Sequence, residues 1–183
     1  MAFKRISQDS AISILLAGLA LVPMLIGRRK DDRSLQVASQ SGNSRPRQAL
    51  ALMLWIYVIA FCLTAAELVA FFYNVYLHPQ ILPPLGMFIR LFLLRALCMA
   101  AWFALPACLS ILMDNLFLSI VFSAAVTIGL HFLSPYSLLS DPTLWADRIS
   151  VGPLLLLIAV CLVWIAVWTA LGCFFYNRAD IKH

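Results

Sequence analysis

The chain of 183 residues is 63% hydrophobic and only 11% charged. A soluble domain carries about 25% charged and about 45–50% apolar residues, so this composition excludes a single domain in water, and it also excludes the fibrous and disordered classes. The net charge is +5, but the basic residues are grouped in one short polar stretch, which indicates an orientation signal in a membrane and not nucleic-acid binding.

Five apolar runs predict five transmembrane helices. Roughly 20 apolar residues cross the hydrocarbon core at a rise of about 1.5 Å per residue. Residues 85–133 are too long for one span, and Asp114 and Asn115 form the polar break within them, so we expect two helices joined by a tight turn. The predicted fold is all-α, a polytopic transmembrane helix bundle in one domain over residues 1–183. The expected spans are 11–27, 48–73, 85–113, 115–133 and 151–176.

The first run is short for a span, and its basic start also fits a signal peptide. No small-residue cleavage site follows it, whereas Arg28, Arg29 and Lys30 directly after it form a stop-transfer pattern. We therefore expect residues 11–27 to remain in the membrane as the first span.

The distribution of basic residues predicts a cytoplasmic C-terminus. With that orientation the cytoplasmic segments hold eight basic residues and the outer segments three, and the reverse orientation exchanges these numbers. Residues 28–47 are then cytoplasmic, and residues 134–150 form an outer re-entrant or interfacial loop. The expected location is a bacterial cytoplasmic (inner) membrane.

Three ionisable residues fall inside the predicted spans, namely Glu67, Arg90 and Arg95. Such residues are costly in a bilayer and are functional candidates by default. Counted at about 1.5 Å per residue, Glu67 lies about 9 Å below the outer membrane surface, and Arg90 and Arg95 lie about 8 and about 15 Å below it. An ion pair between Glu67 and one of the two arginines is therefore expected. It serves either a polar site on a translocation path or the structure alone.

The cytoplasmic stretch is the most informative polar segment. Asp32 and Ser34 predict the start of a short helix, whose apolar side is Leu35, Val37 and Ala38 and which ends at Gly42-Asn43. A helix lying across the cytoplasmic mouth of two spans would be a docking surface for a soluble partner, and the alternative is a plain solvated loop. The expected docking residues are Asp31, Asp32, Arg33, Ser34, Leu35, Val37 and Arg45.

The sequence contains none of the motifs that a membrane enzyme needs. Serine, zinc and aspartate protease patterns and a phosphate-binding glycine loop are absent. The five cysteines are odd in number, lack a C-x-x-C spacing and lie in apolar runs. We therefore expect no catalytic activity, no cofactor and no metal, and we interpret the cysteines as small buried hydrophobes.

Two patterns together resemble the permease subunit of an ATP-binding-cassette exporter of the type-2 class. After the first span come an acidic residue, a short amphipathic stretch and a small residue followed by arginine, here Asp32, Ser34, Leu35, Val37 and Ser44-Arg45. The last span ends in an aromatic residue, a basic residue and Asp-Ile, here Tyr176, Arg178, Asp180 and Ile181.

The resemblance implies a dimeric permease in membrane lipid whose coupling helix, residues 31–40, rests on a separate ATP-binding-cassette ATPase subunit. The family usually has six spans and a basic residue near the position of Ala51, so this chain would be a shortened or divergent member. The alternative is a non-catalytic accessory subunit that packs against a larger membrane complex as a homo- or hetero-oligomer.

Overall fold

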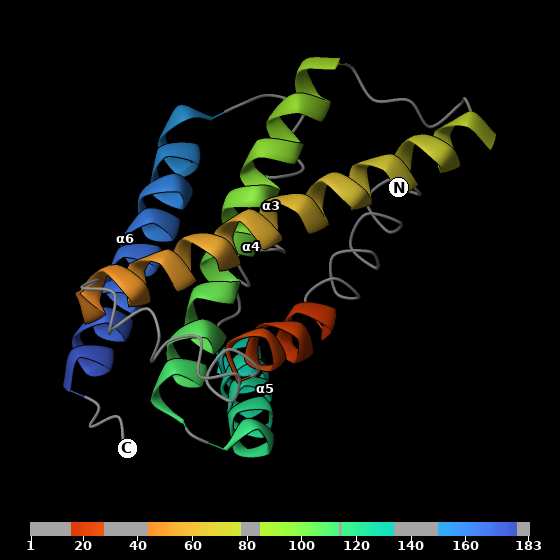
Figure 1. The fold of residues 1–183 in the computed structure, drawn as a ribbon. Coiled ribbons are helices and arrows are strands. Elements are labelled where there is room, and N and C mark those ends of the chain that lie inside the picture. The colour runs from red at the N-terminus through yellow and green to blue at the C-terminus, as the bar shows by residue number, and fades with distance from the viewer. Residues whose placement is uncertain (1–15, 28–43, 78–84, 114, 134–149, 179–183) are drawn as a thin grey trace.

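The computed structural model describes residues 16–27, 44–77, 85–113, 115–133 and 150–178, and the predicted all-α fold is confirmed there (Figure 1). These residues form helices and no strand. The helices are Leu16–Gly27, α3 (Arg45–Leu77), α4 (Leu85–Leu112), α5 (Leu116–Leu133) and α6 (Val151–Arg178).

Three of these helices are long and apolar enough to cross a membrane, namely Pro46–Ala70 within α3, α4 and α6. The described parts of the first and fourth predicted spans are shorter apolar helices, Leu16–Gly27 and Leu116–Val126. The chain is thus a membrane protein with a helical bundle, and the total of five spans stays a prediction.

Helix α3 is longer than the predicted span of 48–73 at both ends. The carbonyl of Ser44 accepts hydrogen bonds from the backbone N–H groups of Arg47 (3.0 Å) and Gln48 (3.3 Å). Pro46 lies in the first turn, where its missing N–H costs nothing. The helix therefore starts within the polar segment and carries three further residues ahead of the apolar run.

Helices α4 and α5 meet where the polar break was predicted. The side chain of Asn115 caps α5, because its Oδ1 accepts hydrogen bonds from the N–H groups of Phe117 (2.9 Å) and Leu118 (3.3 Å). Ser119 of α5 then donates a hydrogen bond of 2.8 Å to Ser110 of α4. Asparagine at a helix start is strongly preferred for this reason, and it fixes the position of the turn.

Helix α4 is the centre of the bundle. It contacts α3, α5 and α6, and 56% of its span is buried, against 33% for α3 and 11% for α6. Figure 1 shows α4 and α6 running in the same direction while α3 crosses them obliquely. Side chains that α4 presents to two neighbours at once are therefore well placed to build a site.

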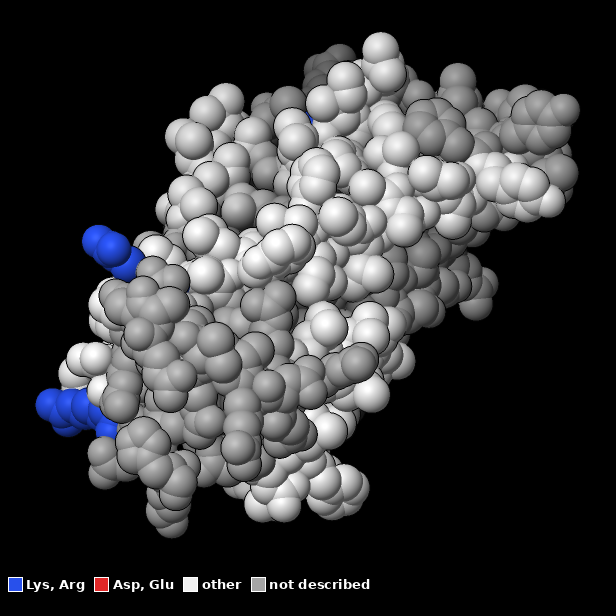
Figure 2. Space-filling model, viewed as in Figure 1, with Lys and Arg blue, Asp and Glu red and all other residues white. Residues whose placement is uncertain are grey.

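The ends of several helices gather at one end of the bundle. A Cβ atom placed on Gly27 would be 3.1 Å from Cδ1 of Leu116, so the end of the N-terminal helix lies at the start of α5. Tyr176 near the end of α6 donates a hydrogen bond of 3.3 Å to Oε1 of Gln48 in α3. We call this the basic end of the bundle, because the exposed side chains of Arg47 and Arg178 lie there (Figure 2).

Gly172 is the point where α6 approaches both α3 and α4. A Cβ atom there would lie 3.6 Å from Cδ1 of Ile111 and 3.8 Å from Cε of Met53, which is ordinary contact. Gly172→Ala should therefore raise the free energy of unfolding by up to about 1 kcal/mol, since alanine favours the helix. Gly172→Leu should lower it by about 1–3 kcal/mol by overpacking.

Unfolding in mixed micelles with increasing SDS measures both changes. The matched control is Gly152→Leu, because a Cβ atom at Gly152 of the same helix meets nothing within 4 Å. Equal stability of Gly172→Leu and Gly152→Leu would contradict the close approach of α6 to α4.

Candidate functional site

An ion pair joins α3 to α4 inside the bundle. Nη2 of Arg95 lies 2.8 Å from Oε1 of Glu67, and the two side chains are only 6% and 9% exposed. This distance is typical of a charge-assisted hydrogen bond between a guanidinium and a carboxylate. The residues were singled out by depth in the sequence, and the structure pairs the deeper of the two arginines with the carboxylate.

Arg90 lies five residues nearer the start of α4 and is partly buried. At a rise of about 1.5 Å per residue, Arg95 is about 15 Å from the start of α4 and about 24 Å from Ile111 near its end. Ile111 is at the level of Gly172 and the basic end. The three ionisable residues therefore lie in the half of the bundle remote from the basic end.

Aromatic rings lie beside the ion pair. Phe61 of α3 and Phe92 of α4 pack edge to face, with ring centroids 5.7 Å apart. Phe61 precedes Glu67 by six residues, and Phe92 lies between Arg90 and Arg95. Their packing holds α3 against α4 in this region.

A pair of thiols at the interface of α4 and α6 was missed by the sequence reasoning. Sγ of Cys98 in α4 lies 3.8 Å from Sγ of Cys161 in α6, and the residues are 1% and 0% exposed. Cys98 follows Arg95 by three residues, so the two share a face of the helix. The site thus extends from Glu67 in α3 through Arg95 and Cys98 in α4 to Cys161 in α6.

The spacing of Arg95 and Cys98 was visible in the sequence, but the cysteine opposite them on another helix was not. The expected burial of the cysteines holds for Cys98, Cys108 and Cys161. It is wrong for Cys62, which is exposed on α3, and Cys173 is intermediate. An apolar run does not reveal which of its residues face lipid, because both faces of a span are apolar.

Further polar contacts connect α3 and α6 nearer the basic end. Thr169 donates a hydrogen bond to the carbonyl of Ile165 (2.6 Å), which leaves its Oγ1 to accept one from the hydroxyl of Tyr57 at 2.5 Å. Together with the bond from Tyr176 to Gln48, this contact ties two levels of α3 to α6. Sequence reasoning did not identify these residues, since Tyr and Thr within apolar runs carry no positional signal.

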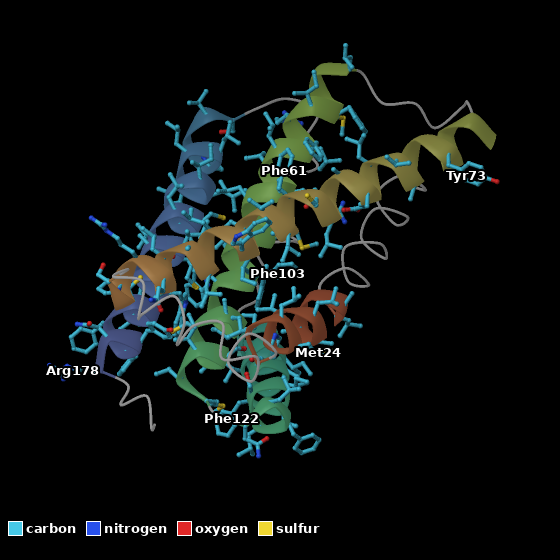
Figure 3. The ribbon with its side chains drawn as sticks, viewed as in Figure 1. Met24, Phe61, Tyr73, Phe103, Phe122 and Arg178 are labelled. Carbon is cyan, nitrogen blue, oxygen red and sulfur yellow. The ribbon has the colours of Figure 1, made fainter. Side chains whose placement is uncertain are left out.

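Most of the expected docking residues, Asp31 to Val37, lie outside the described residues, and Arg45 begins α3. Gly27 ends the N-terminal helix and Ser44 directly precedes α3, so both borders of this segment lie at the basic end. Figure 2 shows the basic side chains of the visible face at that end, while the rest of the described surface there is uncharged. In Figure 3, Arg178 and Tyr73 mark opposite ends of the molecule, and Arg178 lies 4.4 Å over the ring of Phe174.

Compared with protein-family models, curated proteins and solved structures, the chain shows no match. In the described ranges, no group of three or more His, Cys, Asp or Glu side chains is placed to hold a metal ion. The geometry of the ion pair and the thiol pair is therefore the basis for a functional conclusion.

Proposed function

We propose that the chain is a permease-like integral membrane subunit of an ATP-binding-cassette transporter, and that it couples a separate ATPase to export. The observation that carries the proposal is the covered ion pair between Glu67 and Arg95 on two neighbouring spans. Ionisable residues inside membrane spans are expensive and typically mark substrate or ion pathways. A helix bundle that only packs in the membrane would not need ionisable residues inside its spans.

The geometry of α3 supports a mechanical link between the two ends of the molecule. Residues 28–43 connect the N-terminal helix directly to the start of α3 at the basic end. From Arg45 to Glu67 the helix extends about 33 Å at its usual rise. A push on the cytoplasmic segment is thereby transmitted along α3 to the carboxylate, and the ion pair is the contact that this motion would open.

A second candidate is an accessory subunit of a larger membrane complex. The observation that favours it is the exposure of α6, of which only 11% of the span is buried. A helix so little covered has apolar surface on several sides for contact with another membrane protein. In this role the ion pair holds α3 and α4 together and takes no part in transport.

A pull-down from gently solubilised membranes tests the proposed function. The unmodified chain should co-purify an ATP-binding-cassette ATPase, and the double variant Asp32→Ala, Leu35→Asp should release it while still inserting. The matched control makes the same two replacements in the outer loop, as Asp141→Ala with Leu138→Asp, and should retain the ATPase.

Absence of an ATPase from the unmodified sample removes the proposal. Recovery of a stoichiometric membrane protein instead, lost when the apolar surface of α6 is altered, supports the accessory role.

A further inference from the structure

The two thiols at the interface of α4 and α6 form a second candidate site. Cys98 and Cys161 come from two parallel helices and bring their sulfur atoms within 3.8 Å. Leu94 and Leu157 are buried on the same two helices and belong to the same core cluster. No disulfide joins the two sulfur atoms, and both side chains are buried from water.

A guanidinium lies near the thiol of Cys98. Arg95 is three residues before Cys98 in α4, and its side chain interacts electrostatically with both Glu67 and Cys98. A positive charge at this position attracts a negatively charged group at the thiols.

We propose that Cys98 and Cys161 bind a soft monovalent cation, of the class of Cu⁺ or Ag⁺, between their sulfur atoms. Thiolate is the ligand type that selects Cu⁺, and a coordinating thiol gives up its proton on binding. The balanced step is M⁺ + 2 RSH → [M(SR)₂]⁻ + 2 H⁺. The complex carries one negative charge, and Arg95 lies three residues before Cys98 in α4.

The number and kind of ligands exclude other metals at this position. A structural zinc site needs four ligands, and the described residues provide no group of even three. Calcium and magnesium require oxygen ligands, six or more of them. Two sulfur atoms alone suit a cation that is satisfied by two soft ligands.

The sulfur positions fit such a complex with small adjustment. For a sulfur–metal bond of about 2.3 Å, the length known for zinc thiolates, two sulfur atoms 3.8 Å apart subtend roughly 110° at the metal. A linear arrangement needs a separation of about 4.6 Å at the same bond length. The two arrangements thus differ by about 0.8 Å in sulfur separation.

This site is independent of the proposed transport function, because it is built from one chain and requires no ATPase. It is tested by titrating the purified full chain with Ag⁺, which does not change oxidation state, and counting bound ions by native mass spectrometry. The sample is the triple variant Cys62→Ala, Cys108→Ala, Cys173→Ala, which keeps only Cys98 and Cys161. It should bind one Ag⁺ per chain and gain thermal stability on binding.

Adding Cys98→Ala or Cys161→Ala to this background should weaken Ag⁺ binding more than about 100-fold. Loss of a residue that only hydrogen-bonds to a metal ligand already lowers metal affinity about 10–100-fold, and loss of a ligand itself costs more. In the otherwise unmodified chain, Cys98→Ala should lose one bound Ag⁺ and its thermal stabilisation. Cys62→Ala, which removes the exposed thiol of α3, should keep both. This second comparison decides the matter if the triple variant does not fold.

The proposal is overturned if Ag⁺ binds with unchanged affinity after either cysteine is removed. It is equally overturned if the folded two-cysteine variant binds no stoichiometric Ag⁺, or if Cys98→Ala and Cys62→Ala lose the same amount.

Discussion

Glu67→Leu should lower the free energy of unfolding by about 5 kcal/mol, and Arg95→Met should lower it by about 3 kcal/mol, because removal of one partner of a buried ion pair costs about 3–5 kcal/mol. The asymmetry has a chemical cause. The carboxyl group left by Arg95→Met can take up a proton and become neutral, whereas the guanidinium left by Glu67→Leu stays charged. Both side chains are more than nine-tenths buried, so water does not solvate the charge that remains after its partner is removed.

The double variant Glu67→Leu, Arg95→Met should recover most of the lost stability, since an apolar pair of similar volume often replaces a buried ion pair without cost. Equilibrium unfolding in mixed micelles measures all three variants. Arg47→Met is the matched control, because this arginine is exposed at the basic end and should change the stability by less than about 0.5 kcal/mol. Additive effects of the two single changes would contradict the pairing.

The same double variant separates the two roles of the ion pair. A chain that is stable without the pair, yet no longer stimulates the ATPase with which it co-purifies, would assign the pair to transport. Unchanged coupling would assign it to packing between α3 and α4 alone. The stability measurement comes first, because only a folded variant makes the second comparison meaningful.

Position along the chain was enough to predict this ion pair, but not which arginine forms it. Two antiparallel helices joined by a short loop are neighbours, so Glu67 was expected to pair with Arg90 or Arg95. Depth at about 1.5 Å per residue did not choose between them, since it places Arg90 at about 8 Å and Arg95 at about 15 Å against about 9 Å for Glu67, whereas the structure places Arg95 2.8 Å from the carboxylate. The turn between α4 and α5 was predictable for a similar local reason, since Asn115 caps the second helix.

The sequence could not indicate which face each helix turns toward its neighbours. In a bilayer both faces of a span are apolar, so the pattern of Leu, Val and Phe does not reveal that Cys98 faces Cys161 or that Cys62 faces outward. The contact of Tyr57 with Thr169 depends on the same rotation. These parts of the site required the three-dimensional arrangement of α3, α4 and α6.

The start of α3 shows a different limit. A hydropathy run predicts only the apolar part of a helix, so the turn formed by Arg45, Pro46 and Arg47 was assigned to the cytoplasmic segment. In the structure the helix begins there, with Ser44 accepting its first backbone hydrogen bonds. Helix α3, which we propose links the cytoplasmic segment to the ion pair, therefore starts about one turn before the predicted span, among the basic residues.

Phe103→Ala is the second change for which we expect a large effect, a loss of about 3–5 kcal/mol in the free energy of unfolding. Phe103 of α4 is fully buried and packs against the N-terminal helix at Gly18, where a Cβ atom would lie 2.0 Å from Cζ of the ring. The glycine admits the ring, so the helix Leu16–Gly27 reaches the core by this contact. Phe117→Ala on α5 is the control, because that ring is 72% exposed and its loss creates no cavity.

The tight approach at Gly18 makes a further, sharper expectation possible. Gly18→Leu alone should cost about 1–3 kcal/mol, because the new side chain must displace the ring. Combined with Phe103→Ala it should cost less than the sum of the two single changes, because the leucine then occupies the space that the ring has left, and residues in contact couple by about 0.5–3 kcal/mol. Unfolding in mixed micelles measures all three variants. Strict additivity would show that the N-terminal helix does not pack on α4 at this position.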